Sequence, residues 1–304
     1  MAISKIIKNI IEKFIPDNII DLFGNLFHLG YFPLKNKIRK YFLSLNKNEQ
    51  EPEVIEIISY LEKHRLTAIP YDFCKKYNTK KIDVYYDKTS KLRYVYHNNK
   101  RLYFPYKDKE TVRSCYIDLC IEQDINSPHR YETNEFSTED GDIIADIGAA
   151  EGIWALGNAE KAGKIYLFEC KSEWIRSLEK TFEPWKEKTT IVSKFVSNTD
   201  DENNVTLDNF FKKGKVDIIK ADIEGMEINL LQGSQELLKL TDNLKLLLCT
   251  YHRKDDAKKI KEILENSGFT TEYSKGYIFQ ITDKKIDEPY MRRGVIRAKK
   301  KKVL

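Results

Sequence analysis

Small residues and carboxylates interrupt the apolar runs between residues 142 and 170, where they could hold a cofactor. The turn in this segment contains, in order, Asp146, Gly148, Ala149, Glu151 and Gly152. Small residues let the backbone turn tightly and approach a ligand, and the following helix presents its free N–H groups. Glu169 follows Gly152 by 17 residues, close to the spacing at which a doubly wound fold places the acid that binds a ribose diol. The pattern indicates a cofactor that contains ribose, with a purely structural turn as the alternative.

The spacing within this turn distinguishes between two cofactors. A nicotinamide fingerprint has the spacing G-x-G-x-x-G, whereas Gly148 and Gly152 give G-x-x-x-G with Glu151 between them. A carboxylate there repels a pyrophosphate but favours the ammonium and sulfonium groups of S-adenosylmethionine (SAM). SAM therefore fits the turn better. The candidate cofactor-binding residues are Asp146, Gly148, Ala149, Glu151, Gly152 and Glu169.

A second group of charged residues follows the apolar run that begins at Val216. Asp222 stands at its end, Lys220 lies two residues earlier on the same face, and Glu224 and Glu227 come just after it. Asp222 could instead cap the next helix while the two glutamates complement the helix dipole. A lysine and three carboxylates within eight residues exceed what a cap requires. The segment therefore indicates a functional role for at least one of them.

Parallel strands would bring these two groups together, because ligands bind beyond the carboxyl ends of the strands in an open α/β sheet. Short apolar runs without alternation are typical of strands buried on both faces. We expect such strands at 142–148, 164–170, 189–197, 216–222 and 244–252. We expect helices at 152–162, 172–182, 227–240 and 256–267, and a closing antiparallel pair at 269–281 and 292–300. The fold class is therefore α/β, with a doubly wound sheet.

Two changes of pattern predict three segments along the chain. Residues 1–80 are expected to be mainly helical. The first 23 residues form a predicted amphipathic helix, which either covers a core or lies on a membrane surface. Residues 81–111 show the Tyr-rich alternation of a β-hairpin or meander, which packs as a small sheet or stacks sugars or bases. Residues 112–304 form the α/β domain.

Several motifs occur in an order that resembles the FkbM family of SAM-dependent methyltransferases. They are Asp146-x-Gly148-Ala149-x-x-Gly152, Phe168-Glu169, Val205 to Phe211, Lys220 to Glu227, and Leu231-Gln232-Gly233. The resemblance covers roughly residues 140–270 and implies a seven-stranded, Rossmann-like class I methyltransferase sheet. It also implies O-methylation of a sugar, glycan, glycolipid or polyketide-type natural product. Two positions depart from the family pattern, since Cys170 stands where proline is common and Ala150-Glu151 where asparagine is frequent.

Removal of a hydroxyl proton is the chemistry that an O-methyltransferase needs, and Asp222 is our candidate for it. Asp222 acts either as the general base or as a metal ligand that lowers the pKa of the hydroxyl. Lys220 and Glu224 are further candidate catalytic residues, with Lys220 orienting a hydroxyl or keeping Asp222 ionised. His252, after the next strand, is a ligand, a base or a hydrogen-bonded neighbour. A divalent metal at Asp222 and His252 is the less favoured alternative.

Two other segments are candidates for contacts to the cofactor. His129 lies in residues 127–132, which precede the first strand and either fold over the site or serve as an ordinary connector. Ser197 follows the third strand, where adenine contacts usually arise, although a solvated loop explains it nearly as well.

The composition bounds the class of protein and its partners. The 304 residues carry a net charge of +5, and the 5 cysteines form no C-x-x-C pair, which favours a reduced, cytoplasmic protein. Basic residues gather between Lys35 and Lys40 and between Arg292 and Lys302, where a solvated surface is favoured over a phosphate-binding one. We expect a small-molecule or glycan acceptor and no DNA or RNA. The alternatives are a nucleic-acid methyltransferase and a non-catalytic interaction module of the same fold.

Overall fold

The computed structural model describes residues 31–44, 52–78, 81–212, 214–280 and 286–300. The chain divides into two compact units, Met1–Asp72 with Ile281–Tyr290, and Phe73–Gln280 with Met291–Leu304. The amphipathic segment predicted over residues 1–23 lies outside the described residues, as does its predicted contact with a membrane surface. The three-segment division into 1–80, 81–111 and 112–304 stays a prediction.

The described part of the first unit is a pair of helices, α3 (Tyr31–Ser44) and α4 (Pro52–Lys63), that pack against each other. Val54, Ile57 and Leu61 recur at helical spacing on α4 and are buried, as are Ile38 and Phe42 on α3. A 3-10 helix, η2 (Asp72–Lys76), follows at the boundary of the unit.

The second unit begins with the predicted meander and a helix that the sequence analysis did not predict. The strands β1 (Tyr85–Asp87), β2 (Leu92–His97) and β3 (Lys100–Phe104) form a three-stranded antiparallel sheet. Helix α5 (Lys109–Glu122) follows, and the side chain of its N-cap residue Asp108 accepts a hydrogen bond from the backbone N–H of Thr111.

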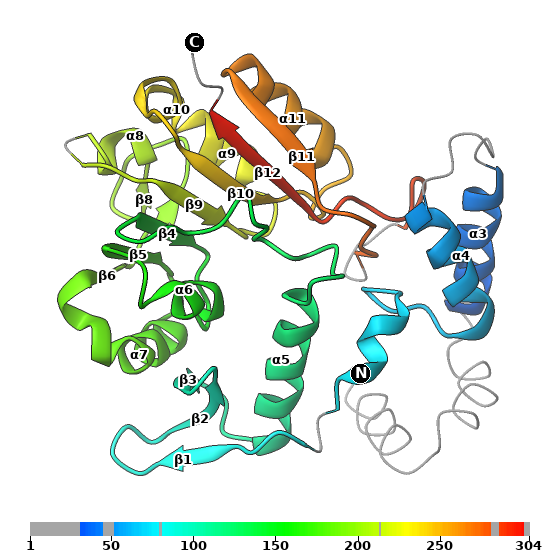
Figure 1. The fold of residues 1–304 in the computed structure, drawn as a ribbon, viewed down its shortest axis with the longest axis horizontal. Helices are drawn as coiled ribbons and strands as arrows, with labels where there is room; N and C mark the ends of the chain where they lie inside the picture. The colour runs from blue at the N-terminus through cyan, green and yellow to red at the C-terminus, as the bar shows by residue number, and fades with distance from the viewer. Residues whose placement is uncertain (1–30, 45–51, 79–80, 213, 281–285, 301–304) are drawn as a thin grey trace. The chain divides into compact units, whose positions relative to one another are not determined.

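A seven-stranded sheet is the centre of this unit and confirms the predicted fold class (Figure 1). Its strands, in spatial order, are β11 (Phe269–Tyr273), β12 (Val295–Lys300), β10 (Lys245–Cys249), β9 (Ile218–Ala221), β4 (Ile143–Ile147), β5 (Lys164–Phe168) and β6 (Thr189–Val192). Strand β12 runs antiparallel to both neighbours, and the other pairs are parallel. The predicted closing antiparallel pair is therefore present as β11 and β12, with β11 at the edge of the sheet and β12 between β11 and β10.

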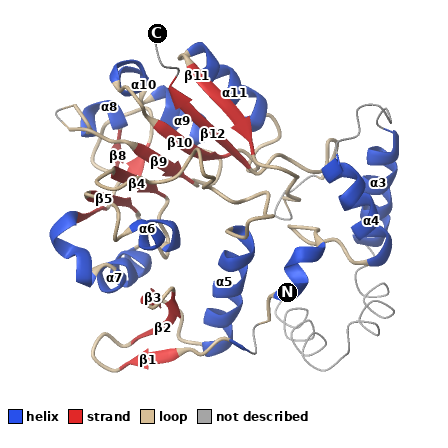
Figure 2. Ribbon diagram, viewed as in Figure 1, coloured by secondary structure: helices blue, strands red, loops and turns tan. Residues whose placement is uncertain are grey.

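Helices cover both faces of this sheet, as Figure 2 shows. They are α6 (Ile153–Asn158), α7 (Ser172–Thr181), η4 (Glu183–Lys188), α8 (Leu207–Phe210), α9 (Glu227–Gln232), α10 (Gln235–Leu240) and α11 (Asp256–Asn266). Alternate residues of each strand enter opposite cores. On β10, Leu247 packs on the side of α5, α6 and the meander, whereas Leu246 and Leu248 pack on the side of α9, α10 and α11. Burial on both faces explains why these strands lack polar alternation in the sequence.

Several predicted elements are shorter than expected, among them the helix expected at 152–162, observed as Ile153–Asn158, and the strand expected at 269–281, observed as Phe269–Tyr273. The strand expected at 189–197 ends at Val192, and β7 (Phe195–Val196) pairs instead with β8 (Asn204–Val205) in a separate two-stranded sheet. The helix expected at 227–240 is divided into α9 and α10 near Gly233, where a Cβ atom would overlap the carbonyl oxygen of Ser197. The strand expected at 244–252 ends at Cys249, which frees the next three residues to form a loop.

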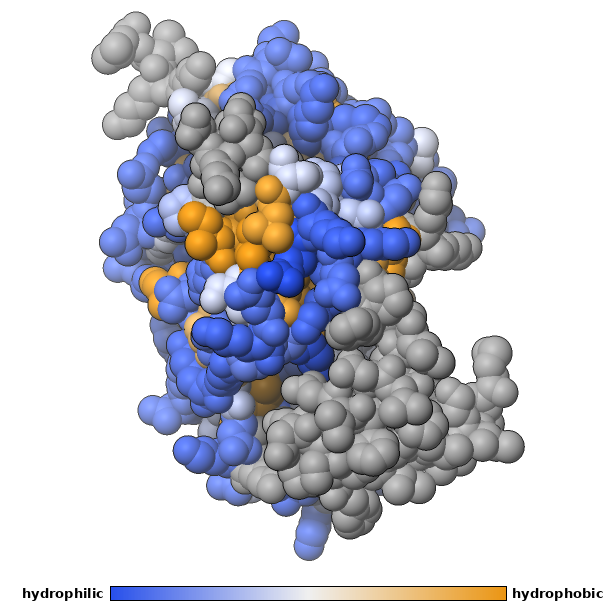
Figure 3. Space-filling model, turned by 90° about the vertical axis from the view of Figure 1, so that its right-hand side faces the viewer, coloured by the Kyte–Doolittle hydropathy of each residue, from blue (hydrophilic) through white to orange (hydrophobic). Residues whose placement is uncertain are grey.

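The surface of the described residues is largely hydrophilic. Figure 3 shows one face, on which most side chains are hydrophilic and a central apolar area is accompanied by smaller ones. Among the described helices, none combines the length and the apolar character that crossing a membrane requires.

A close backbone contact at Gly294 generates a prediction about stability. A Cβ atom at Gly294 would overlap the carbonyl oxygen of Pro128, so Gly294→Ala should lower the free energy of unfolding by about 1–3 kcal/mol. The matched control is Gly157→Ala in helix α6, where a Cβ atom meets nothing within 4 Å and alanine favours the helix. Urea denaturation measures both variants. An unchanged midpoint for Gly294→Ala would contradict the contact.

Candidate active site

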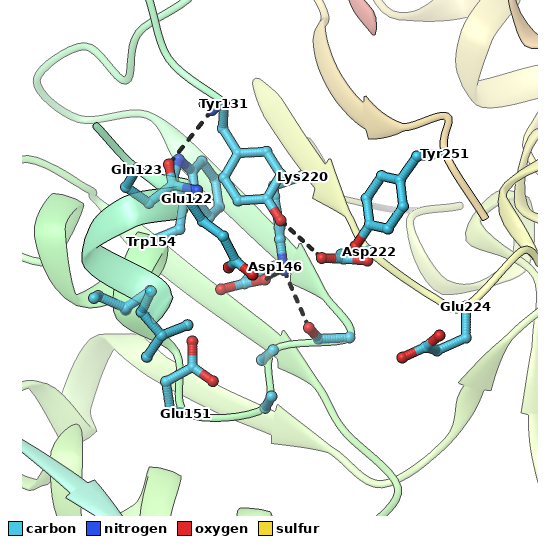
Figure 4. A pocket seen from close by; sticks show the side chains of 15 residues that line it. Glu122, Gln123, Tyr131, Asp146, Glu151, Trp154, Lys220, Asp222, Glu224 and Tyr251 are labelled. Carbon is cyan, nitrogen blue, oxygen red and sulfur yellow. Dashed lines mark hydrogen bonds and ion pairs between the residues drawn. The ribbon is translucent and has the colours of Figure 1, made fainter. Parts of the chain in front are cut away.

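A pocket of about 250 Å³ lies at the carboxyl ends of strands β4 and β9 (Figure 4). Seven of the predicted site residues line it, namely Asp146, Gly148, Ala149, Glu151, Lys220, Asp222 and Glu224. The structure therefore brings together the two charged groups that the sequence separates by about seventy residues. Gly152, Glu169, Ser197, His129 and His252 are outside the lining.

The turn after β4 has an unusual backbone that places it against the strand β9 end. Gly148, Ala150 and Gly152 all have positive φ angles, of 70°, 46° and 76°. A side chain at Gly148 would overlap the carbonyl oxygen of Asp222, so glycine is required for this close approach. Gly152 is the N-cap of α6 and packs against Leu178 and Phe182 on its other side.

Glu169 is held in place by backbone N–H groups at the end of β5. Its Oε2 atom accepts a hydrogen bond from the Ala150 N–H at 3.0 Å, and its Oε1 atom accepts from Cys170 and Lys171 at 2.8 and 2.9 Å. Oε1 therefore already accepts two hydrogen bonds, whereas Oε2 accepts one and keeps a second acceptor position that fits a ribose hydroxyl group.

Glu151 is a buried carboxyl group that faces the pocket (Figure 4). It is 8% exposed, and no side chain among the described residues hydrogen-bonds to it or pairs with it. Burial raises the pKa of Glu151 from 4.5 to about 8. A buried acid that faces a cavity without a partner suits a cationic ligand, so the residue fits the charged end of SAM.

Lys220 and Asp146 form a buried ion pair beneath the pocket. The two residues are partners across β9 and β4, and Lys220 Nζ lies 2.9 Å from Asp146 Oδ1. Lys220 also donates to the carbonyl oxygen of Gly148 at 3.1 Å and lies over the ring of Tyr131, 5.3 Å from its centroid. Although burial opposes it, the carboxylates of Asp146 and Asp222 raise the pKa of Lys220, which stays charged. Lys220 therefore connects strand β4, the turn and Tyr131.

Asp222 is surrounded by hydrogen-bond donors. The Tyr131 hydroxyl donates to its Oδ2 atom at 2.9 Å, His129 Nε2 lies 3.5 Å from the same atom, and His252 Nε2 lies 3.2 Å from Oδ1. Burial alone would raise the pKa of Asp222, but hydrogen bonds from the two histidines hold it well below its usual range. Asp222 is therefore an anion throughout the physiological pH range.

His252 lies between two carboxylates. Its Nδ1 atom is 3.1 Å from Oε1 of Glu227, which is fully buried and also accepts a hydrogen bond from the Ile223 N–H. Although burial opposes it, the hydrogen bonds to Asp222 and Glu227 raise the pKa of His252 to about 10. His252 is thus an imidazolium that keeps Asp222 ionised.

The segment that carries His129 and Tyr131 is attached to strand β12 and the end of β11. Arg297 is 5% exposed and donates to the carbonyl oxygens of Tyr131 and Arg130, each at 2.6 Å. The Ser274 hydroxyl donates to the carbonyl oxygen of Pro128 at 2.5 Å. The segment is therefore a fixed part of the site.

The prediction of a solvated basic surface near the C-terminus was wrong for Arg297, which is buried, whereas Arg292, Lys299 and Lys300 are partly exposed. Arg292 donates to the carbonyl oxygens of Tyr251 and His252 at 2.8 Å, and Lys300 donates to that of Leu238. The sequence pattern showed only the charges, whereas the strand places these donors beside carbonyl groups at the ends of neighbouring elements.

Two groups of side chains offer metal-ligating atoms within 4.8 Å of one another in the described part of the chain. They are His129, Asp222 and Cys249, and Asp222, Glu227 and His252. The second contains Asp222 and His252, the predicted alternative ligands. Both ring nitrogens of His252 lie within 3.2 Å of carboxylate oxygens, whereas His252 Nδ1 and Glu227 Oε2 are buried without a hydrogen bond of good geometry.

Glu224 and Ser197 lie at the margins of the site. Glu224 has a positive φ of 55°, its side chain is 91% exposed, and its Oε2 atom lies 3.8 Å from His252 Nε2. Ser197 is buried, and its backbone packs against Gly233 away from the pocket lining.

Sequence reasoning missed several lining residues. Glu122 and Gln123 come from the end of α5, and Tyr251 comes from the loop after β10. The apolar spacing of Val112, Tyr116 and Leu119 was a helical signal that could have placed Glu122 at a helix end. Nothing in the sequence shows that this end reaches the pocket.

The strand order, the reversed strand β12 and the site at the carboxyl ends of β4 and β9 define a class I methyltransferase fold. Residues 146–271 match the family model described as "Methyltransferase FkbM domain". The predicted resemblance to the FkbM family of SAM-dependent methyltransferases is therefore confirmed over these residues, which are less than half of the chain.

Solved structures of methyltransferases resemble the chain at low identity. The methyltransferase FkbM of Methylobacillus flagellatus KT is 15% identical, with a TM-score of 0.42, over 64% of this chain and 56% of that protein. The magnesium protoporphyrin IX methyltransferase of Synechocystis PCC 6803, solved with bound SAM, is 16% identical, with a TM-score of 0.36, over 53% and 71%. An rRNA methylase of Streptococcus thermophilus is 14% identical, with a TM-score of 0.37, over 54% and 89%. The chain thus spans little more than half of the first of these proteins. No curated protein matches the sequence.

The raised pKa of Glu151 predicts a pH dependence of stability. Because the pKa is about 8 in the folded protein and 4.5 ordinarily, the folded state binds the proton more tightly, and stability falls as pH rises from 4.5 through 8. Glu151→Gln should remove this loss. The free energy of unfolding of the variant minus that of the native protein should therefore be larger at pH 9 than at pH 5, by roughly 1–4 kcal/mol. Urea denaturation at the two pH values measures it.

The exposed Glu187, whose side chain is 91% exposed, is the control for this experiment. Glu187→Gln should track the native protein at both pH values. A Glu151→Gln variant that also tracks it would show that the Glu151 carboxyl titrates normally.

Proposed function

We propose that this methyltransferase transfers the methyl group of SAM to a hydroxyl oxygen of a sugar, glycan or related natural product. The observation that carries the proposal is the Asp222 carboxylate, which lines the pocket at the end of β9 and is kept ionised by His129 and His252.

The turn after β4 and the end of β5 suit the cofactor. Glu169 would accept a hydrogen bond from a ribose hydroxyl group, Glu151 would face the cationic end, and the Gly148 backbone permits close approach. When bound, SAM supplies an electrophilic methyl group on a sulfonium sulfur. The protein's task is then to hold the acceptor oxygen in line with that methyl group and to take away its proton.

Asp222 would accept a hydrogen bond from the acceptor hydroxyl and then take its proton. A carboxylate of low pKa is a poor base toward a free alcohol. The oxygen becomes strongly acidic as its bond to the methyl carbon forms, so a weak base at hydrogen-bond distance suffices. The proton passes from the acceptor oxygen to an Asp222 oxygen, and the acceptor leaves as a methyl ether.

The other predicted catalytic residues take positioning roles in this proposal. Lys220 is bonded to Asp146 and Gly148, so it supports the turn and the Tyr131 ring. His252 keeps Asp222 anionic and oriented. After Asp222 the chain continues with Ile223-Glu224-Gly225, where amine-methylating nucleic-acid enzymes usually have a Pro-Pro-aromatic motif, which supports a hydroxyl acceptor.

Binding of SAM is the first test of this proposal. Isothermal titration calorimetry of the full chain should detect SAM and S-adenosylhomocysteine, and Glu169→Ala should weaken both by roughly tenfold, about 1.4 kcal/mol, because the hydrogen bond from the ribose to the carboxylate is lost. Glu187→Ala is the exposed control. Absence of binding at millimolar ligand would refute the proposed function.

Replacement of Asp222 is the second test. With labelled SAM and a panel of sugars and polyols, Asp222→Asn should lower the rate of methyl-ether formation by roughly 10²–10⁴-fold. Its affinity for S-adenosylhomocysteine should stay within a few-fold, which shows that the variant folds. Asp140→Asn, at an exposed turn, is the control. Native rates for Asp222→Asn would assign proton removal to another group.

A further inference from the structure

The pocket contains more carboxylates than cations. Five acids line it, namely Glu122, Asp146, Glu151, Asp222 and Glu224, against the single lysine Lys220. Lys220 is paired with Asp146 at 2.9 Å, and Asp222 is balanced by the two histidines behind it. Three carboxylates therefore remain without a close cation.

These three acids are weakly paired. No side chain among the described residues binds Glu151. Glu122 has its nearest cationic atom, His129 Nδ1, at 4.0 Å, and Glu224 has His252 Nε2 at 3.8 Å. Both histidines already face Asp222 at shorter distances. Burial raises the pKa of Glu122 and Glu151, so a positive charge beside either one would be stabilised as it restores the ionised form.

Their positions divide the three acids between the two ligands. Glu151 belongs to the turn after β4, which suits the cofactor. Glu122 comes from the end of α5 and Glu224 follows β9. Figure 4 shows Glu224 on the Asp222 side of the pocket, across from Glu151, and the Glu122 carboxyl group beside Asp146, between Glu151 and Asp222. SAM carries one more positive than negative charge, which stabilises the ionised form of Glu151. Glu122 and Glu224, whose side chain is 91% exposed, are the acids left for the acceptor.

We propose that the acceptor is a hydroxyl compound that carries a protonated amine, an amino sugar in chemical class, and that Glu122 and Glu224 select it. This inference rests on the proposed function and names the substrate class of the same site. A phosphate or carboxylate on the acceptor would face like charges in a partly buried pocket, where charges interact more strongly than in water. Phosphorylated sugars, uronic acids and nucleic acids are thereby excluded.

The experiment compares three sugars of one shape and different charge. The full chain is saturated with S-adenosylhomocysteine and titrated calorimetrically with glucosamine, glucose and glucose 6-phosphate. Glucosamine should bind at least about tenfold more tightly than glucose 6-phosphate, with glucose between them, and added salt should reduce the ratio.

Matched double variants assign the selectivity to the two acids. Glu122→Gln with Glu224→Gln should bring the three affinities within about threefold of one another, since like charges are removed while shape is kept. Glu179→Gln with Glu187→Gln, both exposed residues, should keep the native ratio.

The outcomes separate this inference from the proposed function. If S-adenosylhomocysteine does not bind, the proposed function fails. If it binds and glucose 6-phosphate binds as well as glucosamine, or the three sugars cannot be distinguished, the charge selection is overturned while the methyltransferase assignment stands. An unchanged ratio in the Glu122 and Glu224 double variant would also overturn it.

Discussion

Keeping one carboxylate ionised in a largely buried place is the constraint on which this structure depends. Asp222 stands at the end of a strand buried on both faces, where burial alone would favour its neutral form. Three groups stabilise the carboxylate: His252 from the loop after β10, and His129 and the Tyr131 hydroxyl from the segment before β4. Three parts of the chain that are distant in sequence must therefore meet at one side chain.

Strand β12 holds in place the segment that carries His129 and Tyr131, although the two are far apart in the sequence. Its antiparallel course brings Arg297 to the carbonyl oxygens of residues 130 and 131, and Gly294 against Pro128. The end of the chain therefore holds His129 and Tyr131 in position. The buried guanidinium has hydrogen-bond acceptors for this purpose, as a buried charge requires.

The sequence was sufficient for the sheet and for the two charged groups. Runs such as Ile143–Ile147 and Lys245–Cys249 lack alternation because both faces are covered, and that pattern is visible without coordinates. The ends of parallel strands meet at one edge, so Asp146, Glu151 and Asp222 could be placed at a common site.

The parts that could not be predicted depend on tertiary contacts. His252 was left between three roles because the sequence does not show Glu227 reaching its other nitrogen. Lys220 was left between orienting a hydroxyl and keeping Asp222 ionised, because its pairing with Asp146 follows from strand register, which the sequence does not fix. Glu122 was missed because the direction of α5 relative to the sheet is set by packing of Val112 and Tyr116 against the core.

The family match covers residues 146–271, whereas Glu122, His129, Tyr131 and Arg297 all lie outside it. The matched module thus holds the cofactor turn, Asp222 and His252, while flanking chain supplies His129, Tyr131 and one of the acids of the pocket. The reacting carboxylate and part of its surroundings therefore come from different stretches of the chain. Grafting the matched module alone onto another protein would carry over the reaction type but not the acceptor preference.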